Sequence, residues 1–312
     1  MKPMNHLKSI FLASALISGI SITAHAEINV VSSVKPLHSL VSGVMEGIGR
    51  PDLIVKGAAS PHTYSLRPSQ ARQLEDADLV FWMGHELESF LEQPLEAIAT
   101  KGHIVELIDS SKLKKIKMRE GGMFDAHAHD DHDEHEGHGE FDVHVWLDPE
   151  NAKVLVDEIK LALIELDPVN ASKYESNSNK MNMKLDQLID EVSNKLESDK
   201  GKGYVVFHDA YQYFEQRFGM SAVGSITVSP EVVPGANRIR ELKNKINELN
   251  AHCVFSEPQF EPKLVSTVIE GTQANTGVLD PLGASIKDGP ELYFTLIRNM
   301  ADSLHECLSK KD

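Results

Sequence analysis

The sequence predicts an α/β protein of two lobes, each with a parallel sheet, joined by one long helix. Two observations predict the lobes: short apolar runs alternate with polar or amphipathic stretches, and this alternation occurs once in each half of the chain. A third observation predicts the long helix, because residues 168–199 contain no glycine and no proline after Pro168.

The first 26 residues predict a secretory signal peptide. They have a basic start, an apolar core over residues 10–22, and the small-x-small cleavage pattern Ala24-His25-Ala26. The core is shorter than the roughly 20 residues that span a membrane, so a retained anchor is the weaker alternative. We therefore expect a mature chain from Glu27 in an oxidising compartment, most simply a bacterial periplasm, with no direct membrane insertion.

Apolar runs predict the strands of each lobe. In the N-terminal lobe, residues 27–167, they cover residues 28–34, 52–55, 79–82 and 103–107. In the C-terminal lobe, residues 200–312, they cover residues 204–207, 222–226, 253–256 and 277–279. Strands that alternate with helices form parallel sheets, and such sheets bind their ligands at the carboxyl ends of the strands.

Residues 168–199 predict a single helix that links the lobes. Apolar side chains recur at helical spacing on one face: Tyr174, Met181, Leu185, Leu188, Val192 and Leu196. At 1.5 Å per residue this helix would run about 48 Å, which is long enough to cross both lobes. A two-helix hairpin broken near residues 176–179 is the alternative, and we prefer the single helix because that segment lacks glycine and proline.

The charge of the chain excludes some classes of partner. The net charge is −16 for the whole chain, and loss of residues 1–26 removes two lysines and no acid, which makes it −18. So acidic a surface argues against nucleic acid and anionic membranes as partners, and favours cations.

Cys253 and Cys307 are the only cysteines. An even count in an exported chain favours one disulfide, which would stabilise the fold by about 4 kcal/mol on the chain-entropy model. A buried unpaired couple is the alternative. Neither cysteine has the spacing of a redox site or of a zinc knuckle.

A segment at about residues 119–140 is rich in histidine, aspartate and glutamate. It carries five histidines and eight carboxylates and has nothing large and apolar after Phe124. Such a run cannot bury enough surface to order itself, so we expect a disordered loop that binds additional metal weakly. The residues that follow it, 141–147, alternate as a short strand does and end at Asp148-Pro149.

Three histidines stand where an open α/β sheet is expected to bind ligands. His62 and His144 come from the N-terminal lobe, and His208 ends the strand at residues 204–207. Taken singly, each is an ordinary surface or core histidine. Taken together in an acidic exported chain, they predict a metal site of three imidazoles. Asp280 is a fourth candidate by the same logic, with a turn aspartate as the alternative, and Glu257 is a weaker one.

Four segments of the sequence closely resemble one known family. They are Ala59-Ser60-Pro61-His62-Thr63-Tyr64-Ser65-Leu66-Arg67-Pro68-Ser69, His144-Val145-Trp146-Leu147-Asp148-Pro149, Phe207-His208-Asp209-Ala210-Tyr211 and Leu279-Asp280-Pro281-Leu282-Gly283. With the long helix and the histidine-rich loop, they are similar to the periplasmic zinc-binding proteins of high-affinity ABC uptake systems (ZnuA type, metal-binding cluster A-I family). The resemblance covers essentially the whole mature chain.

The resemblance implies a fold, a site and partners. It implies two Rossmann-like lobes joined by one rigid helix, Zn²⁺ held in the cleft between them by His62, His144 and His208, and the disulfide Cys253–Cys307. It also implies delivery of zinc to an inner-membrane ABC permease and its ATPase by a protein that we expect to be a monomer. In relatives a glutamate can precede the first histidine, but Pro61 stands there. The fourth ligand is then water or Asp280.

The residues also bear on the choice of metal and on rival functions. Three neutral imidazoles with at most one carboxylate suit Zn²⁺, whereas Mn²⁺ sites lean towards oxygen ligands, so a manganese-binding protein is the alternative. A zinc hydrolase would need a positioned base or nucleophile, and the chain has no HExxH or Gly-x-Ser-x-Gly motif, so we expect no enzyme. A stand-alone periplasmic zinc buffer remains open.

Overall fold

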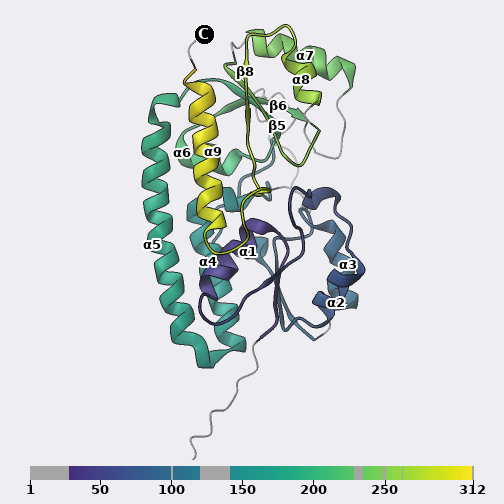
Figure 1. The fold of residues 1–312 in the computed structure, drawn as a ribbon, viewed down its shortest axis with the longest axis vertical. Coiled ribbons are helices and arrows are strands. Elements are labelled where there is room, and N and C mark those ends of the chain that lie inside the picture. The colour runs from purple at the N-terminus through teal and green to yellow at the C-terminus, as the bar shows by residue number, and fades with distance from the viewer. Residues whose placement is uncertain are drawn as a thin grey trace, which may run out of the picture.

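The computed structural model describes residues 28–99, 101–119, 141–227, 235–248, 251–261 and 263–310. They form two lobes stacked end to end, with a layer of long helices along one side of both (Figure 1). Each lobe holds a four-stranded sheet, in the order β2-β1-β3-β4 or β6-β5-β7-β8, and every pairing is parallel. The α/β fold of two parallel-sheet lobes is therefore confirmed. The predicted signal peptide and residues 120–140 of the histidine-rich segment lie outside the described residues.

The N-terminal sheet positions the loop that carries His62. Its strands are β1 (Val30–Ser32), β2 (Asp52–Leu53), β3 (Leu79–Trp82) and β4 (His103–Glu106). The helices of this lobe are α1 (Lys35–Val44), α2 (Pro68–Glu75) and α3 (Ser89–Ala97), and short 3-10 turns are η1 (Pro61–Thr63) and η2 (Leu107–Asp109). Residues of β1 and β3 are all buried, as expected for inner strands of a parallel sheet covered on both faces.

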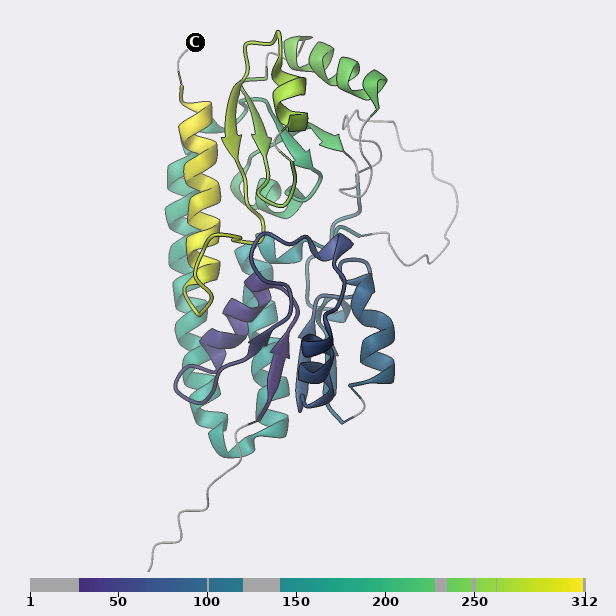
Figure 2. The ribbon, with the colours of Figure 1, turned by 45° about the vertical axis from the view of Figure 1, so that its right-hand side comes forward.

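The C-terminal sheet repeats this arrangement. Its strands are β5 (Tyr204–His208), β6 (Ala222–Thr227), β7 (Cys253–Ser256) and β8 (Asn275–Val278). The helices that follow these strands are α6 (Gln212–Phe218), α7 (Ala236–Glu248) and α8 (Lys263–Ile269), and Figure 2 shows the strands beside one another in the upper part of the molecule. All eight strands predicted for the two sheets are present, with ends shifted by at most two residues.

The strand predicted at residues 141–147 is wrong. Phe141 makes a single antiparallel bridge to Lys117, and η3 (Val145–Leu147) follows as a 3-10 turn. The reason is local: the Asp142 carboxylate accepts the backbone N–H of His144 at 2.9 Å, which turns the chain within two residues. The apolar side chains of Val145 and Leu147 are buried all the same.

The linking helix predicted at residues 168–199 is confirmed. It consists of η4 (Pro168–Asn170), α5 (Ala171–Leu196) and η5 (Glu197–Asp199), and all six apolar residues predicted on its inner face are buried. The hairpin alternative is wrong, because polar side chains at residues 176–179 find partners without breaking the helix. Ser178 Oγ donates to Tyr174 O at 2.8 Å, and Asn177 Nδ2 donates to the carbonyls of Val44 and Glu46, both at 2.9 Å.

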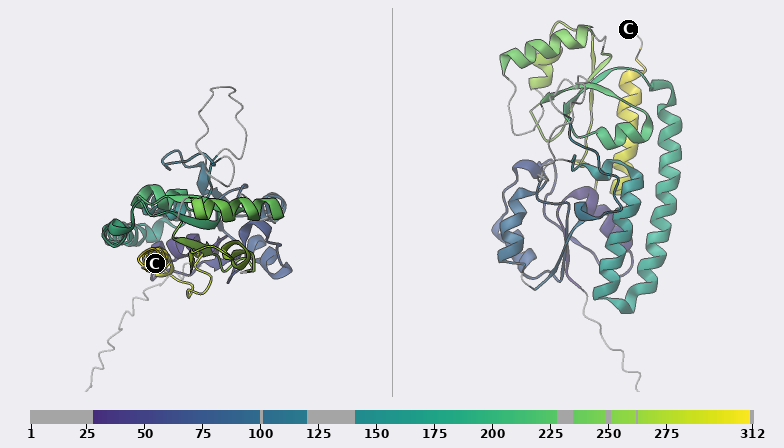
Figure 3. Two further views of the ribbon diagram at one scale, coloured as in Figure 1. Left: turned by 90° about the horizontal axis from the view of Figure 1, so that it is seen from above. Right: turned by 180° about the vertical axis from the view of Figure 1, so that it is seen from behind.

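Two further long helices, α4 (Pro149–Leu166) and α9 (Leu292–Leu308), pack against α5 (Figure 3). Three ion pairs join α5 to α9 at a constant sequence separation of 107: Lys184–Glu291, Glu191–Arg298 and Lys195–Asp302. The constant separation shows that the two helices run in the same direction. Helix α9 also packs against α1 of the N-terminal lobe. The lobes are thus joined by a layer of helices rather than by α5 alone.

The disulfide Cys253–Cys307 is present and confirms the prediction. It ties β7 to the end of α9, with 6.2 Å between the two Cα atoms. None of the helices within the described residues is both long and apolar enough to cross a membrane.

Candidate metal centre

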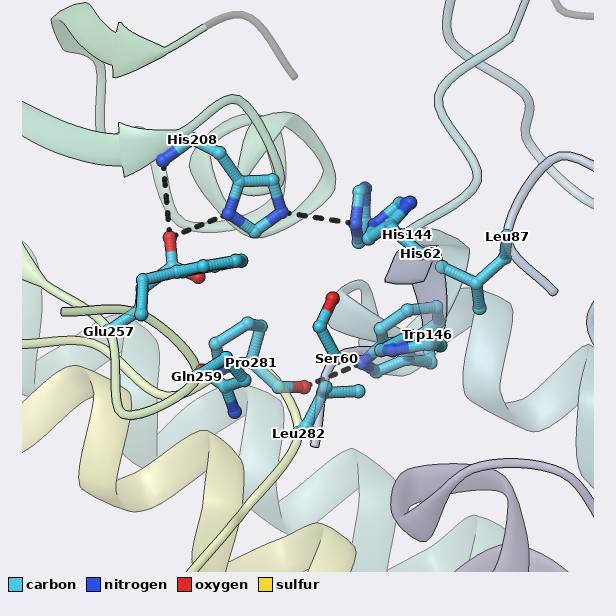
Figure 4. A pocket seen from close by; sticks show the side chains of 12 residues that line it. Ser60, His62, Leu87, His144, Trp146, His208, Glu257, Gln259, Pro281 and Leu282 are labelled. Atoms are coloured by element: carbon cyan, nitrogen blue, oxygen red, sulfur yellow. Dashed lines mark hydrogen bonds and ion pairs between the residues drawn. The ribbon is translucent and has the colours of Figure 1, made fainter. Parts of the chain in front are cut away.

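The three predicted histidines come from different segments and meet between the lobes (Figure 4). His62 lies in η1, in the loop that follows β2, and is half-buried. His144 directly precedes η3 and His208 is the last residue of β5, and both are buried. Two ligand candidates therefore come from the N-terminal lobe and one from the C-terminal lobe.

One ring nitrogen from each histidine lies within 4.8 Å of the others, and among the described residues this is the one group with the spacing of a metal site. Nε2 of His144 and Nε2 of His208 are 3.5 Å apart. Nitrogens about 2.1 Å from a tetrahedral zinc ion lie about 3.4 Å from each other. The spacing of this pair therefore fits a shared metal ion.

A carboxylate lies behind each of the two buried imidazoles. His144 Nδ1 donates to Asp142 Oδ1 and His208 Nδ1 donates to Glu257 Oε1, both at 2.7 Å. A carboxylate only accepts, so the proton stays on Nδ1 and the Nε2 lone pair is free for a cation. Asp142 was not among the predicted site residues, although the Asp-x-His spacing could have indicated it. Glu257, a weaker ligand candidate from the sequence, is the hydrogen-bond partner of His208 in the structure.

The pKa values of the imidazoles reflect these surroundings. Burial, followed by the charges of His144 and His208, lowers the pKa of His62 to about 2. Burial alone would also lower the pKa of His208, but the charge and hydrogen bond of Glu257 outweigh it and raise that pKa. His62 is therefore neutral and ready to bind a metal ion, whereas a metal ion at His208 competes with protons as the pH falls.

The structure does not bring Asp280 into the three-histidine group. Its Oδ1 accepts the side-chain N–H of Gln259 at 2.9 Å and the backbone N–H groups of Leu282 at 3.1 Å and Gly283 at 2.9 Å. Its Oδ2 accepts the backbone N–H of Ala284 at 2.6 Å. Asp280 therefore acts as the turn aspartate that the alternative interpretation described.

Trp146 forms hydrogen bonds between the two lobes beside the histidines. Its Nε1 donates to Pro281 O at 2.9 Å, and its own carbonyl accepts the Tyr293 hydroxyl at 2.6 Å. Both partners lie in the C-terminal lobe, Pro281 in the loop after β8 and Tyr293 in α9. The sequence analysis gave Trp146 no role, because the contact joins residues 135 positions apart.

Comparison with known proteins identifies the family. The family model described as "Zinc-uptake complex component A periplasmic" (ZnuA) matches residues 30–307. This chain belongs to the ZnuA family. It is 52% identical over 334 residues to the "High-affinity zinc uptake system protein ZnuA" of Brucella suis biovar 1, with 98% of this chain and all of that protein covered. The predicted resemblance is confirmed.

Solved structures of other proteins share the fold. "Crystal structure of ZnuA" matches with a TM-score of 0.77 at 22% identity, over 91% of this chain and 100% of the other. The "Mn-bound periplasmic metal binding protein" from Candidatus Liberibacter asiaticus matches with a TM-score of 0.73 at 22% identity, over 90% and 99%. At this identity these two structures show the shared fold alone.

Proposed function

We propose that this chain is the zinc-binding component of a high-affinity uptake system, and that it holds one Zn²⁺ between its lobes through His62, His144 and His208. The observation that carries the proposal is the meeting of three imidazoles, two of them backed by carboxylates. That arrangement is typical of protein zinc sites. The family model and the names of the relatives support the same function.

The donor set favours zinc over manganese. Three nitrogen donors converge, and the nearby carboxylates of Asp142, Glu257 and Asp280 are each engaged by donors of the protein. Mn²⁺ prefers oxygen ligands, which this centre does not offer among the described residues.

The same contacts argue against a hydrolase. A zinc hydrolase needs a base that faces the metal-bound water. Glu257 is the one carboxylate among the described residues that line the cavity, and its Oε1 accepts the Nδ1–H of His208. The chain then acts as a carrier: we propose a periplasmic monomer, exported by residues 1–26, that delivers zinc to an ABC permease driven by its ATPase. The alternative function, a stand-alone periplasmic zinc buffer, would bind zinc without delivering it to a permease.

Alanine substitution of each histidine tests the site. His62→Ala, His144→Ala and His208→Ala should each weaken tight zinc binding by more than about 100-fold, since loss of a partner behind a ligand already costs 10–100-fold. His103→Ala is the matched control, because His103 is exposed on β4, and it should leave the zinc affinity unchanged. Competition titration with a chromogenic zinc chelator measures each affinity.

The outcome for His208→Ala decides whether both lobes hold the metal. Unchanged zinc affinity in that variant would contradict a site shared between the lobes. Loss of zinc uptake by cells whose chromosomal gene carries the His208→Ala change, at wild-type protein level, distinguishes a carrier from a buffer.

A further inference from the structure

Helix α6 of the C-terminal lobe contacts the carboxylate that lies behind His144 of the N-terminal lobe. Asp142 Oδ1 accepts the backbone N–H of His144 at 2.9 Å and its Nδ1–H at 2.7 Å. The other oxygen, Oδ2, accepts the side-chain N–H of Gln212, the first residue of α6, at 3.2 Å. One oxygen of Asp142 therefore holds the imidazole, and the other is held by a helix of the opposite lobe.

The orientation of the Gln212 amide follows from its two acceptors. Its Nε2 also donates to the carbonyl oxygen of Lys117 at 3.4 Å. A carboxylate and a carbonyl can only accept, so the NH₂ group must face both of them and the amide oxygen must face away. Gln212 is 6% exposed and Asp142 is 2% exposed. The amide thus replaces the water that would solvate this carboxylate at a protein surface.

The residue next to Gln212 fixes the main chain of Asp142. The Tyr213 hydroxyl donates to Asp142 O at 2.7 Å and accepts the backbone N–H of Ile116 at 3.0 Å. Asp142 N donates to Ile116 O at 2.8 Å, which closes a ring of hydrogen bonds. Because this ring holds the backbone without Gln212, the contribution of Gln212 is to orient the carboxylate group itself.

We propose that Gln212 is a positioning residue for His144. By holding Asp142 from the C-terminal lobe, it keeps the imidazole of the N-terminal lobe in the orientation that binds metal. A partner behind a ligating imidazole fixes both its tautomer and the direction of its ring, so a carboxylate free to rotate would hold His144 less firmly. This inference rests on the proposed three-histidine zinc site.

One element of the C-terminal lobe then controls ligands from both lobes. His208 ends β5, and α6 begins directly after the loop that follows it. The same turn of chain places His208 through its own backbone and His144 through Gln212 and Asp142. A displacement of α6 from Asp142 would break the Gln212 bond and weaken the hold of His144 on the metal. A partner that separates the lobes at this point would therefore lower the zinc affinity before any ligand leaves.

Replacement of Gln212 by methionine removes the donor at similar side-chain volume. Gln212→Met should lower the zinc affinity about three- to tenfold, which is less than the roughly 10–100-fold cost of losing the partner of a ligating histidine. Gln216→Met is the matched control. Gln216 lies on the same helix and accepts Lys114 Nζ at 2.9 Å, so this variant also loses a bond to the N-terminal lobe, but no ligand depends on it. Its zinc affinity should be unchanged. Competition of the full chain with a chromogenic zinc chelator measures both affinities.

Two further backgrounds show whether the effect passes through Asp142. In the Asp142→Ala chain, the addition of Gln212→Met should cause no further loss of zinc affinity. In the Glu257→Gln chain it should cause the same loss as in the wild type, because Glu257 backs His208 instead. General loosening of the contact between the lobes would give the same loss in all three backgrounds. Gln212→Leu is the second variant, in case Gln212→Met does not fold by circular dichroism.

Three results would overturn the role of Gln212. They are a wild-type zinc affinity in Gln212→Met, an equal further loss in the Asp142→Ala background, and an equal loss in Gln216→Met. Failure of the proposed function looks different, because the wild-type chain would then show no tight zinc binding that His144→Ala weakens.

Discussion

At the scale of single residues, the carboxylate behind His208 governs how this histidine responds to pH. Glu257 raises the pKa of His208, whereas burial lowers the pKa of His62 to about 2. Above its pKa, His208 is neutral and would bind the proposed zinc ion without losing a proton. As the pH falls through this raised pKa, the metal must displace a proton, and the affinity falls by up to tenfold per pH unit. His62 adds no competition near neutral pH.

Glu257→Gln should move this pH dependence. Without the negative charge the pKa of His208 falls, so the loss of zinc affinity on acidification should begin at a lower pH than in the wild type. At pH 8 the affinity should be about 10–100-fold weaker, because the imidazole loses its carboxylate partner. Chelator competition between pH 5.5 and 8 measures both effects. Glu96→Gln, on the exposed face of α3, is the control, and an onset that stays in place in Glu257→Gln would refute the assigned role.

The ligand candidates could be predicted from the sequence, but the residues around them could not. His62 and His208 follow or end runs that read as strands, and parallel sheets bring such positions together. His144 was predicted from its ordered segment beside the histidine-rich loop. Asp142 was missed because the alternating pattern of residues 141–147 predicts a strand, while the side chain of Asp142 turns the backbone instead. The orientation of Gln259 depends on Asp280, a contact between two loops that no local pattern encodes.

At the scale of elements, the packing of α5 against its neighbours stabilises the molecule far more than its ion pairs do. Leu188 is fully buried on the inner face of α5, so Leu188→Ala should lower the free energy of unfolding by about 2–5 kcal/mol. Glu191→Ala removes an exposed pair with Arg298 and should cost less than about 1 kcal/mol. Urea denaturation of both variants gives the comparison, and equal costs would contradict it.

The long helix was predictable and its partner was not. Helix α5 lacks glycine and proline and has one apolar face, which suffices for a prediction. Helix α9 is buried on several sides, because it packs against α1, α5 and β8 at once. Its role in joining the lobes depends on contacts with residues more than 100 positions away, which the periodicity of its own sequence does not contain.

At the scale of the whole molecule, the two lobes share one hydrophobic core. A continuous cluster of buried side chains runs from β1 and α1 through α4 and α5 to α9, and a smaller cluster lies on the other face of the C-terminal sheet. The division into an N-terminal lobe, a linking helix and a C-terminal lobe, at residues 27–167, 168–199 and 200–312, therefore stays a proposal about domains. The core itself crosses these boundaries.

A chain that ends at residue 199 should consequently fail to fold cooperatively. It keeps the N-terminal sheet and α5 but loses α9, which packs against α1, and Tyr293, whose hydroxyl binds Trp146 O. The full chain should unfold in one thermal transition by circular dichroism, shifted upwards by zinc because the metal binds the folded state. A sharp cooperative transition in the truncated chain would show that the N-terminal lobe is an independent domain.

The contacts of α9 with the first helix also bear on the time course of folding. Tyr293 N donates to Ser39 Oγ and Lys35 Nζ donates to Ile286 O, across sequence separations of 254 and 251. Contacts of such long range slow folding, since the loop between them must close before they form. The N-terminal sheet, although synthesised first, cannot complete its core until α9 arrives. Synthesis can thus run almost to completion while the chain remains unfolded, which suits the export that we propose for this chain.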